Sequence, residues 1–98
     1  MSYTLVVRPE AESDIEEALG WYESQSEGLA ADFLQAVEEG LRKIQESPLS
    51  YQVVREQIRR ARLRRFPYSL MYRVSEGTVF VLGCFHAKRN PEHWLERS

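Results

Sequence analysis

Apolar and polar residues repeat along this chain with two different periods, and the change between them falls near residue 48. Residues 3–8 (YTLVVR) form a short β-branched run that stops at Pro9, which predicts a first strand. Pro9 can occupy the first position of a helix, and acidic residues follow it near the positive end of the helix dipole. Helical spacing of apolar residues then predicts an amphipathic helix, carried by Ala11, Ile15, Ala18, Leu19 and Tyr22.

A polar segment, ESQSEG at residues 23–28, interrupts this pattern and predicts a break. From Leu29 to about Gln45, apolar residues recur at three- and four-residue steps, which predicts a second amphipathic helix. Ser47 and Pro48 end it, because the residue before a proline disfavours helical geometry. Two helices joined by a short turn form an antiparallel hairpin.

After Pro48 the pattern takes a period of two, which is typical of strands. Residues 58–66 predict a strand that directs Ala61 and Leu63 to one face and three arginines to the other, namely Arg60, Arg62 and Arg64. Pro67 marks a tight bend. Residues 68–74 and 78–85 predict two further strands around the turn SEG, which contains Gly77. The last strand is apolar on both faces, which favours an interior position in the sheet.

The element order predicts one α+β domain over residues 1–98, β-α-α-β-β-β, with a helical hairpin packed on one face of a mostly antiparallel four-stranded sheet. A hydrophobic fraction of 43% and a charged fraction of 29% are ordinary for a soluble domain. No run approaches the roughly 18 apolar residues of a membrane span, and the N-terminus lacks a signal-peptide pattern, so we expect a cytoplasmic protein. The only cysteine, Cys84, lies in an apolar run and is expected to be a buried, unreactive thiol.

The net charge of −2 conceals a strong asymmetry between the two halves of the chain. Residues 1–51 carry eleven acidic and three basic side chains, a charge of −8, whereas residues 52–98 carry four acidic and ten basic, a charge of +6. This division predicts an acidic helical layer and a basic layer suited to an anionic partner, although mutual attraction of the halves on folding is the simpler interpretation.

Several kinds of chemistry have no support in the sequence. The two histidines lack a nearby cysteine pair or HExxH spacing, so we expect no metal site. There is no glycine-rich phosphate loop and no GxSxG, and we therefore expect no cofactor and no serine-hydrolase activity.

Two phrases, RRFPYSLMYRV and CFHAKRNPEHWLER, give the chain its most specific resemblance. Together with the opening strand and two helices, they resemble the RelE/ParE superfamily of toxins from bacterial type II toxin–antitoxin modules, over essentially the whole chain. The resemblance includes the ParE-like branch known as the plasmid stabilisation family. It implies a toxin that arrests growth and is neutralised by a cognate antitoxin, whose C-terminal segment wraps the toxin, so that a hetero-oligomer is one expected form.

The superfamily has two main mechanisms, and this chain matches the ribonuclease mechanism incompletely. RelE-like members cut messenger RNA on the ribosome, whereas ParE-like members poison DNA gyrase. Arg60, Arg62 and Arg89 fall where RelE-like enzymes carry lysines or an arginine, but Ser69 falls where they carry another arginine. Their C-terminal tyrosine is also absent, with Trp94 near its place. These departures favour a ParE-like, non-enzymatic toxin that inhibits gyrase.

His86 keeps the enzymatic alternative open. Some superfamily ribonucleases, such as those resembling YoeB, use a histidine near the end of the last strand, and an imidazole is a plausible acid or base at neutral pH. In that alternative, His86 and Arg89 are catalytic, and Arg60 and Arg62 position RNA. Otherwise His86 caps the strand and hydrogen-bonds the tail. A third alternative is an inactive remnant that retains only antitoxin binding.

The residues predicted to contact a target or an antitoxin are mostly arginines, because guanidinium groups suit both phosphate and carboxylate oxygens. A solvated strand face is the simpler interpretation for any single arginine. Trp21 and Tyr22 are expected in the core or in an antitoxin groove. The predicted binding set is Arg60, Arg62, Arg64, Arg65, Arg73, Arg89 and Trp94.

Overall fold

A helical hairpin followed by a sheet organises the chain, in the order that the sequence predicts. The structure, a computed structural model, describes residues 3–88. Its elements are β1 (Thr4–Val7), α1 (Pro9–Gln25), α2 (Glu27–Glu46), the 3₁₀ turn η1 (Pro48–Ser50), β2 (Val53–Arg55), β3 (Ile58–Arg62), β4 (Tyr68–Ser75) and β5 (Thr78–His86).

The sheet has five strands, in the order β1-β5-β4-β3-β2. β1 pairs with β5 in parallel, from Thr4 opposite Thr78 onward, and all other neighbours are antiparallel. The α+β class and the interior position of β5 are therefore confirmed, but the prediction of four strands was one short. The additional strand, β2, has only three residues and is joined to β3 by a turn at Glu56, whose φ is 53°. A positive φ is usually found at glycine, so the sequence carries no sign of this turn.

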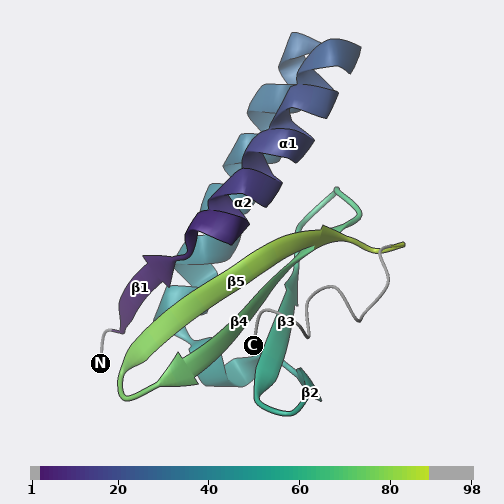
Figure 1. Cartoon of the computed structure of the whole chain (residues 1–98). Coiled ribbons are helices and arrows are strands. Elements are labelled where there is room, and N and C mark those ends of the chain that lie inside the picture. Colours follow the sequence, from purple (N-terminus) through teal and green to yellow (C-terminus); the bar gives the residue numbers. More distant parts are fainter. Residues whose placement is uncertain (1–2, 89–98) are drawn as a thin grey trace.

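The two helices are separated by a single residue rather than by the six-residue break that the polar segment suggested. α1 continues to Gln25, and α2 begins at Glu27 after Ser26, which has an extended backbone. The hairpin end projects beyond the sheet (Figure 1). Residues 23–28 are all exposed. Helical turns that contribute no residue to the core need no apolar stripe, so the periodicity disappears there although the helix does not. No helix within residues 3–88 is long and apolar enough to cross a membrane.

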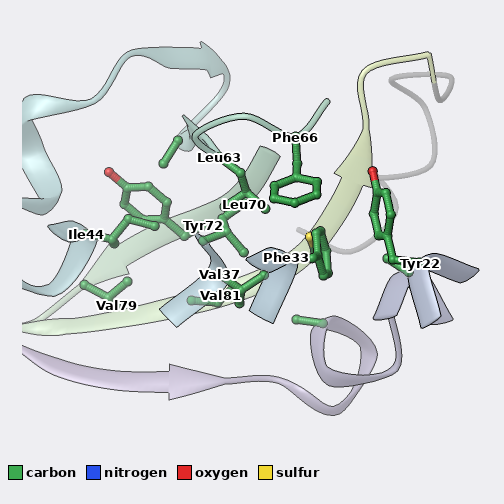
Figure 2. Packing of buried hydrophobic residues seen from close by; sticks show 14 of the residues in the cluster. Tyr22, Phe33, Val37, Ile44, Leu63, Phe66, Leu70, Tyr72, Val79 and Val81 are labelled. Atoms are coloured by element: carbon green, nitrogen blue, oxygen red, sulfur yellow. The ribbon is translucent and has the colours of Figure 1, made fainter. Parts of the chain in front are cut away.

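The main core lies between the hairpin and one face of the sheet, and Figure 2 shows its interdigitated side chains. Phe33 is fully buried among the rings of Tyr22, Phe66 and Tyr68, with centroid separations of 5.1–5.3 Å. α2 approaches the sheet closely at Gly40, where a Cβ would lie 3.1 Å from a methyl carbon of Leu70. An added Cβ at this position would require the tightly packed side chains of Leu63 and Leu70 to shift by a few tenths of an ångström.

A second, smaller cluster lies on the opposite face of the sheet, which we call the outer face. Side chains alternate across a strand, so Ile58 and Ala61 in β3 point to opposite sides, and only Ala61 joins the main core. The outer cluster consists of Ile58, Met71, Leu82 and Phe85, with Val54 and Phe80 packed against it.

Candidate functional site

Arg60 and Arg62 lie on the outer face of the sheet. Arg60 is opposite Met71 in β4 and Arg62 is opposite Ser69, and residues directly opposed across two strands share a face. Met71 belongs to the outer cluster, which fixes the side. Arg62 is exposed and Arg60 is half-buried, and both lie on the face that also holds the apolar outer cluster.

A third arginine of the predicted set, Arg73, joins this face further along β4. Its guanidinium carbon lies 4.6 Å from the centre of the Phe80 ring, its neighbour across the strands. This distance is within the range of a cation–π interaction. Arg60, Arg62 and Arg73 therefore share the outer face, and we call them the outer-face arginines.

Arg64 and Arg65 do not join them, contrary to the expected alternation of Arg60, Arg62 and Arg64. β3 ends at Arg62, and the chain then turns through Arg65, whose φ is 72°. Arg65 lies 3.6 Å from the carboxylate of Asp32 in α2, an exposed ion pair. Arg64 contributes to lowering the pKa of Glu39, although the main cause is the hydrogen bond from Lys43. Both loop arginines therefore border the helical layer.

Arg59, which the sequence did not distinguish from its neighbours, has a structural role. Its Nη1 donates to the backbone oxygens of Leu49 and Tyr51, at 3.2 and 2.6 Å. These bonds tie β3 to the segment after α2. Arg59 therefore stabilises the fold through these two hydrogen bonds.

His86 lies on the helix side of the sheet, away from the outer-face arginines. Its Nδ1 accepts a hydrogen bond from the Lys88 backbone N–H at 3.0 Å, and its ring meets Tyr68 edge-on at 5.1 Å. An accepting Nδ1 carries no proton, so the proton of the neutral ring lies on Nε2. The expectation that His86 caps the strand and bonds the following segment is met by the bond from Lys88.

A pocket of about 560 Å³, which the sequence did not reveal, lies between α1 and the end of the sheet. We call it the α1 pocket. Asp14, Glu17 and Trp21 follow one stripe of the helix at spacings of three and four residues. The opposite wall comes from the strand ends. The remaining lining residues are Ala18, Tyr22, Pro67, Tyr68, Cys84 and His86.

Cys84 forms part of the pocket floor and is poorly suited to be a nucleophile. Burial, with a smaller effect of the Asp14 charge, raises the pKa of its thiol to about 12. The thiolate is the reactive form, so almost none is present at neutral pH. Asp14 is itself held in place, since one carboxylate oxygen accepts the Cys84 backbone N–H at 3.0 Å.

The raised pKa of Cys84 predicts a loss of stability in alkali. The thiol ionises near pH 9 in the unfolded chain but only near pH 12 in the folded protein. The free energy of unfolding should therefore fall as pH rises above 9, by up to about 1.4 kcal/mol per pH unit from this group. Urea denaturation between pH 8 and 10 measures the slope, and Cys84→Ala should flatten it. Equal slopes in the two proteins would contradict this expectation. Burial also raises the pKa of Tyr72, so this residue adds to the loss of stability mainly above pH 10.

The predicted site residues thus occupy three separate places. The outer face holds Arg60, Arg62 and Arg73, the β3–β4 loop holds Arg64 and Arg65, and the α1 pocket holds His86. The other two members, Arg89 and Trp94, lie outside the described residues. Within residues 3–88, no group of three or more histidine, cysteine or acidic side chains is arranged to hold a metal ion.

The fold is similar to those of several solved toxin structures. A chromosomal ParDE toxin–antitoxin system from P. aeruginosa matches with a TM-score of 0.78 and 18% identity, covering 87% of this chain and 96% of that one. The RelBE2 toxin–antitoxin complex from Mycobacterium tuberculosis matches with a TM-score of 0.65 and 25% identity, covering 88% of this chain and 99% of that one. A mutant of the E. coli toxin RelE in the free state matches with a TM-score of 0.67 and 18% identity, covering 99% of this chain and 94% of that one.

Sequence comparison identifies the family more directly. Curated proteins gave no match. The family model for the ParE toxin of the type II toxin–antitoxin system, parDE, matches residues 5–91, which is nearly the whole chain. The match confirms the resemblance carried by the two sequence phrases. The chain therefore belongs to the ParE toxin family of type II toxin–antitoxin systems.

Proposed function

We propose that this protein is a cytoplasmic toxin that arrests growth by inhibiting DNA gyrase, without catalysis of its own, and that a cognate antitoxin neutralises it. The family match over residues 5–91 is the observation that carries the proposal. In this role it would stabilise the plasmid or chromosomal segment that encodes the pair.

The placement of the site residues supports a non-enzymatic mechanism. Ribonuclease chemistry needs a general base, an acid and cations that converge on one phosphate. His86 faces the α1 pocket, whereas Arg60 and Arg62 lie across the sheet on the outer face. Ser69, where the resembling ribonucleases carry an arginine, lies directly opposite Arg62, so this position beside Arg62 carries no cation.

The outer-face arginines are the proposed contact for the antitoxin. Three guanidinium groups beside an apolar cluster suit an extended segment that carries both carboxylates and apolar side chains. The RelBE2 structure from Mycobacterium tuberculosis, which is 25% identical to this chain, is a complex of a toxin with its antitoxin. The same face would meet the target when the antitoxin is absent.

The target can be identified by pulse labelling after induced expression in a bacterial host. We expect DNA synthesis to fall before protein synthesis, with cell filamentation, and co-expressed antitoxin to prevent both. His86→Gln should remain fully toxic, because in this proposal the imidazole moves no proton. Glutamine preserves a polar side chain at the strand end, so the comparison isolates proton transfer.

Other outcomes would indicate the alternative mechanisms. An early fall in translation with cleaved messages, together with loss of toxicity in His86→Gln, would make the protein a ribosome-dependent endoribonuclease. If neither synthesis falls while the antitoxin still binds, the chain is an inactive remnant.

A further inference from the structure

We propose that the outer-face arginines bind the phosphate backbone of duplex DNA. The inference deepens the proposed function and rests on it for one point, the identity of this DNA as the segment that gyrase holds. The antitoxin, which we place on the same face, would then block a contact with DNA as well as a contact with protein.

The sheet carries positive charge without carboxylates of its own. None of the five strands contains an acidic residue, and within residues 3–88 none of the three outer-face arginines makes an ion pair. Glu56, in the turn between β2 and β3, lies at the rim, where it lines a shallow pocket with Arg73. Residues 89–98 contain two arginines and two glutamates, so they add no net charge. The charge of this face therefore favours an anionic ligand.

The placement of the three arginines suits a linear polyanion. Arg60 and Arg62 are two residues apart on β3, which separates their Cα atoms by about 7 Å. Arg73 lies two residues beyond Met71, the residue opposite Arg60, so it is a diagonal neighbour of Arg60 at about 7–8 Å. The cations thus follow one another at similar steps, and a nucleic-acid strand also carries its charges at regular intervals. The Ser69 hydroxyl, opposite Arg62, adds a donor of the kind that contacts phosphate oxygens.

The aromatic residues of this face favour a duplex over a single strand. Proteins that bind single-stranded nucleic acids stack the bases on exposed aromatic rings. Among the described residues, Phe85 is only 4% exposed, and the half-buried ring of Phe80 already contacts the guanidinium of Arg73. A duplex keeps its bases stacked inside and offers its phosphates to cations. Phosphate contacts alone are therefore sufficient for the ligand that we propose.

The first arm of the test measures the fluorescence anisotropy of a short labelled duplex between about 50 and 200 mM salt. The whole chain has a net charge of −2, so its overall charge would not attract DNA, and binding must come from a local surface. The logarithm of the affinity should fall with the logarithm of the salt concentration with a slope of about −2 to −3, as expected for two or three phosphate contacts. Arg62→Gln should weaken binding several-fold and reduce this slope by about 1.

Arg42→Gln provides the matched control. It removes the same charge from an exposed arginine of α2, in the helical layer on the other side of the sheet, and should leave affinity and slope unchanged. Equal effects of the two variants, or no binding by the wild type, would overturn the inference. Single-stranded DNA and RNA of the same sequence should bind more weakly than the duplex, and tighter binding of either would overturn the assignment to duplex DNA.

The second arm measures inhibition of purified gyrase in a supercoiling assay. Arg62→Gln should require a several-fold higher concentration than the wild type, whereas Arg42→Gln should match the wild type. If the wild type and Arg62→Gln inhibit gyrase equally and neither binds the duplex, the inference fails and the proposed function stands. If the wild type does not inhibit gyrase, the proposed function fails, and duplex binding that Arg62→Gln weakens would support the DNA contact alone.

Discussion

Replacing Phe33 by alanine is expected to lower the free energy of unfolding by about 3–5 kcal/mol, the usual loss for a buried phenylalanine. The side chain is fully buried and contacts the rings of Tyr22, Phe66 and Tyr68, which cannot all move to fill the space. Figure 2 shows Phe33 with Tyr22 and Phe66. Small domains are stable by only about 5–15 kcal/mol, so this one change should remove a large part of the total. Urea denaturation followed by circular dichroism measures the loss.

Leu34→Ala is the matched control for this prediction. Leu34 follows Phe33 on the same helix but is 39% exposed, so its truncation should cost less than about 1 kcal/mol. A similar loss in both variants would contradict a special contribution of the aromatic cluster, because alanine itself favours the helix. The cluster joins α1, α2 and the β3–β4 loop, so its loss should also disturb the α1 pocket, which shares Tyr22 and Tyr68.

Reversing the charges of Arg60 and Arg62 together, to glutamate, is expected to weaken antitoxin binding at least about a hundredfold. Each arginine bonded to a carboxylate contributes roughly 1.5–3 kcal/mol, and the reversed charge adds repulsion. Both side chains are on the outer face, so the substitution should leave the main core intact. Isothermal titration calorimetry with the purified antitoxin measures the change, and circular dichroism verifies the fold.

The control for this pair is the double charge reversal of Arg64 and Arg65. It makes the same change in net charge, but these residues border the helical layer, where Arg65 meets Asp32. We expect less than a threefold change in affinity, since exposed ion pairs contribute little and salt screens distant charges. An equal loss in the two double variants would show that the antitoxin responds to overall charge and that the outer face is not its contact.

Most of the fold followed from local patterns in the sequence. Pro9 after a β-branched run predicted the start of α1, and Gly77 predicted the β4–β5 turn, where Glu76 and Gly77 both have positive φ as a two-residue hairpin loop requires. Two of the errors fell where non-glycine residues adopt that same geometry. Glu56 and Arg65 do so without any signal in the sequence, which concealed β2 and extended β3 past its true end.

The candidate site could be predicted only in part, because a side chain's face depends on where its strand ends. The alternation correctly placed Arg60 and Arg62 on one face. It wrongly added Arg64 to that face, because β3 ends at Arg62. The α1 pocket escaped prediction for a different reason. Its walls come from Asp14 and Trp21 on one side and Tyr68 and His86 on the other, and only the tertiary fold brings these segments together.

The parallel pairing of β1 with β5 has a consequence for how the protein is made. The two strands come from opposite ends of the described chain, and β5 is the last of the five to be synthesised. Contacts between distant segments form slowly, since a long loop must close first, and a chain emerges from the ribosome with its N-terminal part leading. β1 therefore remains unpaired until β5 has been synthesised, while the helices and the other strands form. We expect this late closure of the sheet to impose a delay between synthesis of the chain and its activity, during which an antitoxin can reach the nascent protein.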